Sequence, residues 1–288
     1  MGLNEILLVL AALLPAVILC VYVFQKDRAE KEPVSLLLCL MGLGAAVCIP
    51  AATVENGLLG ALGALFGDPT PAEGEPITLG FRLYAFVENF FCVALVEEGF
   101  KFLVLVLVTR KNRHFNSLFD GIIYSVFVSL GFAALENVLY VLQFGWMNAL
   151  IRGVLSVPGH MFFAVFMGWY YSLWHMADLA AGQEAGLKQA GLIPPNAVPF
   201  SGSRFLVQSL AVPVLIHGLY DYCCTIPTFT ATVLLYGLMI CLYVHCFRTI
   251  GKVSRADMDD VSYTNSMILL KYPFLASVFR PAPPQWRP

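Results

Sequence analysis

Residues 93–108 read VALVEEGFKFLVLVLV, and this stretch decides the fold because it places charged residues inside a run that is long and apolar enough for a membrane helix. A membrane-spanning helix needs about 20 consecutive, mostly apolar residues. Glu97, Glu98 and Lys101 lie in the middle of such a run, which covers residues 82–109. An ionisable group at that depth costs about 2.5–3.5 kcal/mol on the insertion scale. The stretch therefore predicts a membrane helix that turns its charged residues towards other helices or towards water.

The composition of the whole chain agrees with a membrane protein. The 288 residues are 59% hydrophobic and 12% charged, and the mean hydropathy is +0.75. A soluble domain usually carries about 25% charged residues. Lipid is therefore an expected partner, and the absence of a basic run argues against a nucleic-acid partner. The eight cysteines include no C-x-x-C pair, so we expect buried free cysteines rather than a disulfide framework or a thiolate zinc site.

The apolar runs predict an all-α, polytopic transmembrane helical bundle with about seven spans. The predicted spans are residues 3–24, 34–56, 82–109, 118–143, 151–175, 204–224 and 228–249. Residues 57–66 are also apolar, and they either extend the second span or form a separate interfacial helix. We expect the first run to be retained as a span, because no Lys or Arg precedes it and no small-residue cleavage pattern follows it.

Along the chain, connections that are rich in Lys and Arg alternate with connections that contain few or none. Cytoplasmic connections are the basic ones, so the N-terminus is predicted outside and the C-terminus inside. Fourteen of the seventeen Lys and Arg residues then lie on the cytoplasmic side, the exceptions being Arg82, Lys101 and Arg152. Residues 1–249 form the predicted transmembrane domain, and residues 250–288 form a cytoplasmic tail. The connection 176–203 is expected to be flexible, and the terminal PAPPQWRP is expected to be extended or disordered.

Three further spans carry polar residues at depth. GFAALENVLYVL holds Glu136 and Asn137, SVPGHMFFAVFMGWYY holds His160, and VPVLIHGLYDYCC holds His217 and Asp221. Intramembrane ionisable residues usually face the bundle interior, pair with one another and mark function. Four helices can bring these groups together in the outer half of the bilayer.

The spacing supports convergence, because residues four apart share a helix face. The pairs spaced in this way are Glu97 with Lys101, Glu136 with Tyr140, and His217 with Asp221. Simpler roles exist for single residues. Lys101 could serve merely to neutralise a neighbouring glutamate, and an intramembrane histidine often hydrogen-bonds a backbone carbonyl. Asp120 is explained as a first-turn carboxylate. Two histidines with several carboxylates on four spans are better explained by a functional site.

Four motifs occur in order along residues 80–225, and together they resemble one family. Residues 97–101 read EEGFK, residues 119–140 read FDGIIYSVFVSLGFAALENVLY, Arg152 and His160 follow, and residues 217–221 read HGLYD. This series resembles the PrsW family of intramembrane proteases, in the superfamily of the CAAX prenyl endopeptidases. The resemblance implies an enzyme of the bacterial cell membrane that cleaves a membrane-anchored regulatory protein, such as an anti-sigma factor, from the outer side. The prenyl-endopeptidase branch has Asn where this chain has Asp221.

The resemblance and the residue chemistry together predict a water-activating hydrolase. The predicted catalytic residues are Glu97, Glu98, His160, His217 and Asp221, and the predicted supporting residues are Lys101, Glu136, Asn137 and Tyr140. Glu97 is the preferred general base. His160, His217 and Asp221 could hold zinc, whose fourth position would be water. A carboxylate mechanism without metal stays open, because the H-E-x-x-H signature is absent.

Other functions fit part of the same pattern. A proton-coupled transporter would also carry intramembrane Glu and His residues, although no paired broken helices favour it. A non-catalytic scaffold of the same superfold would need the acidic residues only for assembly. A CAAX-type endopeptidase would require prenylated substrates. We expect hydrolysis of a single-pass membrane protein, and the sequence names neither the substrate nor the scissile bond.

Overall fold

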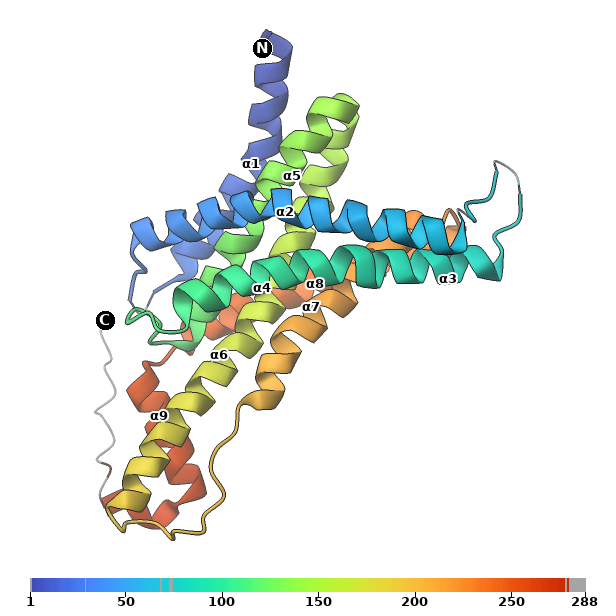
Figure 1. Cartoon of the computed structure of the whole chain (residues 1–288). Helices are drawn as coiled ribbons and strands as arrows, with labels where there is room; N and C mark the ends of the chain where they lie inside the picture. The colour runs from blue at the N-terminus through green and yellow to red at the C-terminus, as the bar shows by residue number, and fades with distance from the viewer. Residues whose placement is uncertain (1, 29, 68, 73–74, 278, 280–288) are drawn as a thin grey trace.

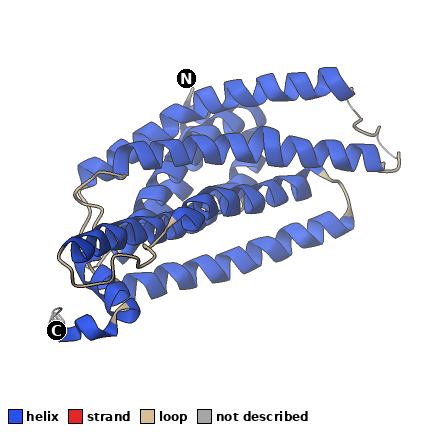
Figure 2. Cartoon of the chain, turned by 60° about the horizontal axis from the view of Figure 1, so that its bottom comes forward, coloured by secondary structure: helices blue, strands red, loops and turns tan. Residues whose placement is uncertain are grey.

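The computed structural model describes every residue except 1, 29, 68, 73–74, 278 and 280–288. The described residues form helices joined by short connections, and no strand occurs among them (Figures 1 and 2). The elements in chain order are α1 (Leu3–Lys26), α2 (Val34–Phe66), α3 (Leu79–Val87), the π-helical turn η1 (Glu88–Ala94), α4 (Leu95–Thr109), α5 (Leu118–Val154), α6 (Ser156–Gln189), α7 (Ser203–Thr225), α8 (Phe229–Arg255), α9 (Asp260–Lys271) and the 3₁₀ turn η2 (Pro273–Ser277).

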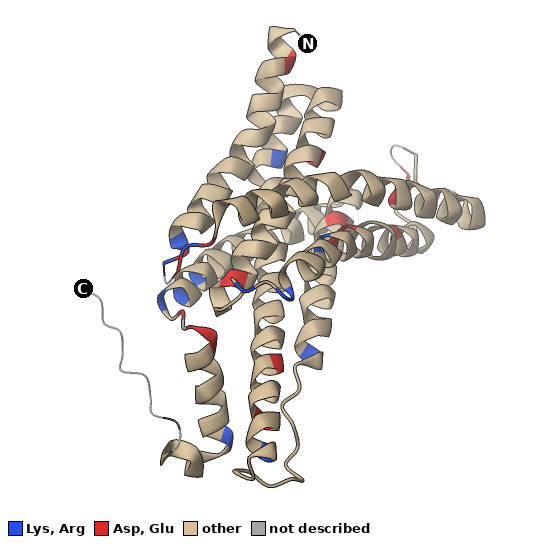
Figure 3. Cartoon of the chain, turned by 60° about the vertical axis from the view of Figure 1, so that its left-hand side comes forward, with Lys and Arg blue, Asp and Glu red and all other residues tan. Residues whose placement is uncertain are grey.

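These helices confirm the predicted all-α membrane bundle. Four helical stretches among the described residues are long and apolar enough to cross a membrane, and one of them, Leu118–Gln189, contains both α5 and α6. The unit α3–η1–α4 and the helix α7 complete seven helical passes. Figure 3 shows long helical stretches without charged residues. Residues 57–66 extend α2, whereas the predicted orientation of the termini stays a prediction.

Helix α5 forms the centre of the bundle, and its first half is almost completely buried against α1, α2 and α6. Glycines allow α2 to approach it closely. A Cβ atom added to Gly44 would lie 2.0 Å from the carbonyl oxygen of Val128, and one added to Gly131 would lie 2.0 Å from that of Met41. Phe132 packs beside this crossing against α2. The close contact places the next turn of α5, which carries the predicted supporting residues, between α2 and α6.

Two breaks in regular helix shape the passes around the site. The turn η1 widens the third pass just before the Glu-Glu pair, and such π-helical turns frequently occur at functional sites. In it, the Asn89 amide donates to the Ala85 carbonyl at 2.7 Å and to the Thr225 hydroxyl at 3.0 Å, which joins the pass to α7. The second break is Gly145, whose φ of 77° interrupts α5 at a single residue. This break lies in the predicted connection between the spans 118–143 and 151–175, and the chain reverses direction there, because Arg152 contacts Asn137 and His160 contacts Glu136 across it. The connection is shorter than predicted, since helix resumes directly after Gly145.

The prediction of a flexible connection over residues 176–203 is partly wrong, whereas the cytoplasmic location of residues 250–288 stays a prediction. Helix α6 continues to Gln189 instead of ending near residue 175, and α9 lies beside its extension (Figure 1). Glu184 is buried there, and its carboxylate accepts hydrogen bonds from the Lys271 ammonium at 2.6 Å and the Phe200 N–H at 2.8 Å. Apolar residues of the connection and of α9 pack around this pair. The terminal residues 281–288 lie outside the described residues.

Candidate active site

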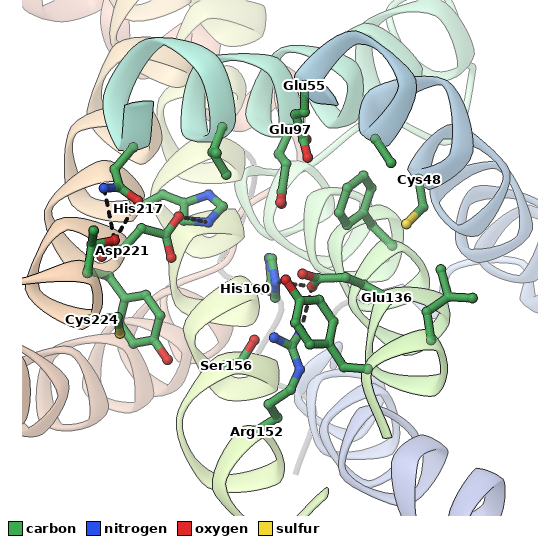
Figure 4. A pocket seen from close by; sticks show the side chains of 18 of the residues that line it. Cys48, Glu55, Glu97, Glu136, Arg152, Ser156, His160, His217, Asp221 and Cys224 are labelled. Carbon is green, nitrogen blue, oxygen red and sulfur yellow. Dashed lines mark hydrogen bonds and ion pairs between the residues drawn. The ribbon is translucent and has the colours of Figure 1, made fainter. Parts of the chain in front are cut away.

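A cavity of about 690 Å³ opens within the bundle, and the predicted polar residues gather around it (Figure 4). Its walls come from α2, α3–η1–α4, α5, α6 and α7. The ionisable residues that line it are Glu55, Glu97, Glu136, Arg152, His160, His217 and Asp221. The four predicted spans therefore converge, as their spacing suggested, and α2 adds a wall that the sequence had not indicated.

Lys101 lies at the buried end of this group and joins three of its members. Its ammonium donates to Glu97 Oε2 at 2.9 Å and to Glu98 Oε1 at 2.8 Å, and it lies 3.0 Å from His160 Nδ1. The ammonium also stands over the Phe132 ring at 4.2 Å. An ammonium has three donors, so these three acceptors satisfy it completely. Lys101, itself completely buried, thus fixes the directions of both glutamates and of His160.

His160 is held from its other side by a second ion pair. Because Nδ1 accepts from Lys101, the proton of the neutral ring lies on Nε2, which donates to Glu136 Oε2 at 3.0 Å. The same Glu136 oxygen lies 2.8 Å from the Arg152 guanidinium. Arg152 also donates to Asn137 Oδ1 at 3.1 Å, and its guanidinium lies 4.0 Å from the Tyr140 ring centre. These contacts form a chain from Lys101 to Arg152 across one wall of the cavity.

His217 lies between two carboxylates on the opposite wall. Its Nδ1 is 3.0 Å from Glu98 Oε1, and its Nε2 is 3.1 Å from Asp221 Oδ2. Both contacts are hydrogen bonds only when both ring nitrogens carry protons, so the geometry favours the imidazolium form. The ring also stacks on Phe163, with a centroid distance of 4.7 Å. His217 is therefore a fixed acid, whereas His160 is a fixed neutral ring.

The site contains a donor set that fits a transition metal. One donor atom each from Glu97, His160 and His217 lie within 4.8 Å of one another, and all three residues are buried. Two imidazoles and a carboxylate are a known catalytic zinc donor set. The predicted set contained Asp221 in place of Glu97. The structure places Asp221 against His217 Nε2, so the set that it brings together differs from the predicted one.

Not every predicted residue reaches the cavity. Glu98 does not line it, because its carboxylate turns to Lys101 and His217 behind the cavity wall. Asn137 is completely buried and donates to the Ala12 carbonyl of α1 at 2.8 Å, which leaves its oxygen for Arg152. The sequence analysis gave no role to Glu55. It named Arg152 as an exception in the charge count and within the series of motifs, and these were the available signals for Arg152, but it did not include Arg152 among the site residues.

A multi-pass helical membrane protein with an acid–histidine centre at the inner end of a cavity belongs to the class of intramembrane enzymes. A family model described as "PrsW family intramembrane metalloprotease" matches residues 32–247. The chain belongs to this family, and it is a protease.

Individual relatives support the same family over most of their length. "Protease PrsW" of Clostridioides difficile is 29% identical over 245 residues, which cover 82% of this chain and 87% of the relative. The proteins with the same name from Bacillus subtilis and Geobacillus kaustophilus are 29% and 31% identical, each over 75% of this chain and over 81% and 78% of their own. No solved structure matches the chain.

Proposed function

We propose that the cavity hydrolyses a peptide bond of a membrane-anchored protein, with Glu97 as the general base. The observation that carries this proposal is that Glu97 lines the cavity while Lys101 holds one of its oxygens. Glu98, its neighbour, turns away to His217, so the two adjacent glutamates have different roles. A general base must face the substrate, and Glu97 is the member of the pair that does so.

The reaction follows from this division of roles. Glu97 accepts a proton from a water molecule as the water oxygen bonds to the scissile carbonyl carbon. The carbonyl oxygen becomes an oxyanion, and the imidazolium of His217, held by Glu98 and Asp221, stabilises it by its charge. Glu97 then returns its proton to the nitrogen as the C–N bond breaks. His160 and Arg152 hold Glu136 in place beside this centre.

The same residues offer ligands for a metal ion. Glu97, His160 and His217 would hold it, and it would supply a Lewis acid for the scissile carbonyl. Lys101 contacts Glu97 and His160 in the described arrangement, so its ammonium would have to leave these two donors. His217 contacts a carboxylate at each ring nitrogen, so one nitrogen would have to lose its proton and its carboxylate contact before it could bind a metal. The metal, and zinc as its identity, are therefore part of the proposal.

The proposed substrate is a single-pass membrane protein in a bacterial plasma membrane. The resemblance makes a membrane-anchored regulatory protein, such as an anti-sigma factor, the first substrate to try. Purified protein in lipid vesicles should cleave it, and Glu97→Gln should not. Cleavage that a chelator abolishes and zinc restores supports the metal-dependent mechanism. Cleavage that the chelator leaves unchanged supports the carboxylate mechanism without metal. Undiminished cleavage by Glu97→Gln contradicts the assignment of Glu97 as the base.

A further inference from the structure

Glu55 on α2 is a cavity residue to which the proposed mechanism gives no role. It lines the same cavity as Glu97, and its carboxylate lies beside that of Glu97 in Figure 4. Its Oε1 atom is buried and has no hydrogen-bond partner among the residues that the structure describes. The next residue, Asn56, instead donates its amide back to the Ala52 carbonyl of its own helix at 2.7 Å. A buried carboxylate oxygen without a donor is costly, and it requires a partner from outside the described contacts.

The charges of the site explain why Glu55 lacks a partner. Five carboxylates belong to the site, those of Glu55, Glu97, Glu98, Glu136 and Asp221, against the two permanent cations Lys101 and Arg152. Lys101 is bound to Glu97, Glu98 and His160, and Arg152 is bound to Glu136 and Asn137. Even with His217 charged, the carboxylates exceed the cations. Glu55 is the acidic residue of the cavity that none of these cations contacts.

The place of Glu55 along the cavity indicates what would meet it. Cys48 and Ala51 of α2 pack beside Phe132, at the level of the buried centre. Glu55 lies one helical turn beyond Ala51, about 6 Å further along α2 at 1.5 Å per residue. Leu59, which also lines the cavity, lies one more turn along α2 in the same direction. A chain that enters from that end passes Glu55 before it reaches Glu97.

We propose that Glu55 is a substrate subsite for a basic side chain, lysine or arginine, close to the scissile bond. An extended chain advances about 3.3 Å per residue, so the distance of one helical turn corresponds to about two residues from the cleaved bond. The ammonium or guanidinium would donate to the unpartnered Glu55 oxygen and supply the missing positive charge. This inference rests on the proposed function, because it names a feature of the substrate for the same cavity.

The test is a set of single-pass substrates in which Lys, Arg, Leu or Glu is placed at each of the six positions around the scissile bond. Wild-type enzyme should cleave the Lys and Arg versions with at least tenfold higher kcat/KM than the Leu version at one of these positions. Glu55→Gln, which is nearly isosteric, should reduce this ratio to about one. Glu55→Lys should reverse the preference towards Glu. Asn56→Ala is the matched control on the same helix and should keep the wild-type ratio.

A binding measurement keeps the inference falsifiable if a Glu55 variant loses turnover for other reasons. The affinity of the Lys and Leu substrates is compared in Glu97→Gln protein and in Glu97→Gln/Glu55→Gln protein, and only the first should prefer Lys. Cleavage by wild type without a basic preference, or a preference that survives Glu55→Gln, overturns the subsite and leaves the proposed function intact. If wild type cleaves none of the substrates, the proposed function fails and the subsite fails with it.

Discussion

Replacing Lys101 with methionine would remove an ammonium that three buried acceptors share. Lys101 is completely buried, and Glu97, Glu98 and His160 lie within 3.0 Å of its nitrogen. Methionine has a similar length but no donor, so two carboxylates would keep their charge without their cation. Breaking a buried ion pair by removing one partner costs about 3–5 kcal/mol. At about 2 °C per kcal/mol for a chain of this size, the Tm should fall by about 6–10 °C.

The assay is thermal unfolding of the purified protein in one detergent, followed by intrinsic fluorescence. Lys252→Met is the control, because Lys252 is exposed near the C-terminal end of α8 and its loss should change the Tm by about 1 °C or less. The double variant Lys101→Met/Glu98→Gln should recover part of the loss, since it removes one of the uncompensated charges. A Tm of Lys101→Met within 2 °C of wild type would show that the ammonium does not hold the carboxylates together.

Three other outcomes follow from the structure. Glu97→Gln should lower kcat by about 10²- to 10⁴-fold, whereas Glu98→Gln, which loses bonds to two partners, should lower the Tm more than Glu97→Gln does. Burial and neighbouring carboxylates raise the pKa of Glu32, in the α1–α2 connection, to about 8. Because the unfolded chain loses this proton near pH 4.5, the free energy of unfolding should fall as the pH rises from 5 to 8, and Glu32→Gln should flatten that dependence. Gly131→Ala should destabilise the α2–α5 crossing by about 1–3 kcal/mol, because a Cβ atom has no room there. Gly42→Ala is the control, since a Cβ atom at Gly42 meets open space. Equal Tm values for the two variants would contradict the close contact.

The spans could be predicted because hydrocarbon thickness sets their length and the apolar runs report it directly. The ends of the spans were less predictable, since hydropathy does not determine where a helix stops. Helix α6 continues for fourteen residues beyond the predicted end at residue 175, to Gln189. Its extension is stabilised by the contact of Glu184 with Lys271, which lies 87 residues away in the sequence. A tertiary contact of that kind leaves no periodic signal in either segment.

The site residues also divide into those with a local signal in the sequence and those that only the tertiary structure reveals. Glu97, Glu136, His160 and His217 stood out because an ionisable group in an apolar run has few structural explanations. Glu55 stands near the end of the predicted span 34–56, where a carboxylate could equally face water, so the burial of its Oε1 atom rather than its residue type distinguishes it. Which carboxylate meets which imidazole depends on side-chain direction as well as on helix spacing.

Asp221 stands where the prenyl-endopeptidase branch has Asn, and this difference bears on the proposed roles of the two histidines. An asparagine at the position of Asp221 would give His217 a neutral partner on one side, and the amide could donate directly to an oxyanion. With Asp221 present, an ionised carboxylate cannot donate, so the positive charge that an oxyanion requires must come from the ring that Asp221 holds. His160 cannot take that role, because the Lys101 ammonium beside Nδ1 disfavours a second positive charge on its ring. The contacts of Lys101 and Asp221 therefore favour different charge states for two histidines whose ring centres are 5.4 Å apart, and this difference is why the proposed mechanism uses His217 as the electrophile.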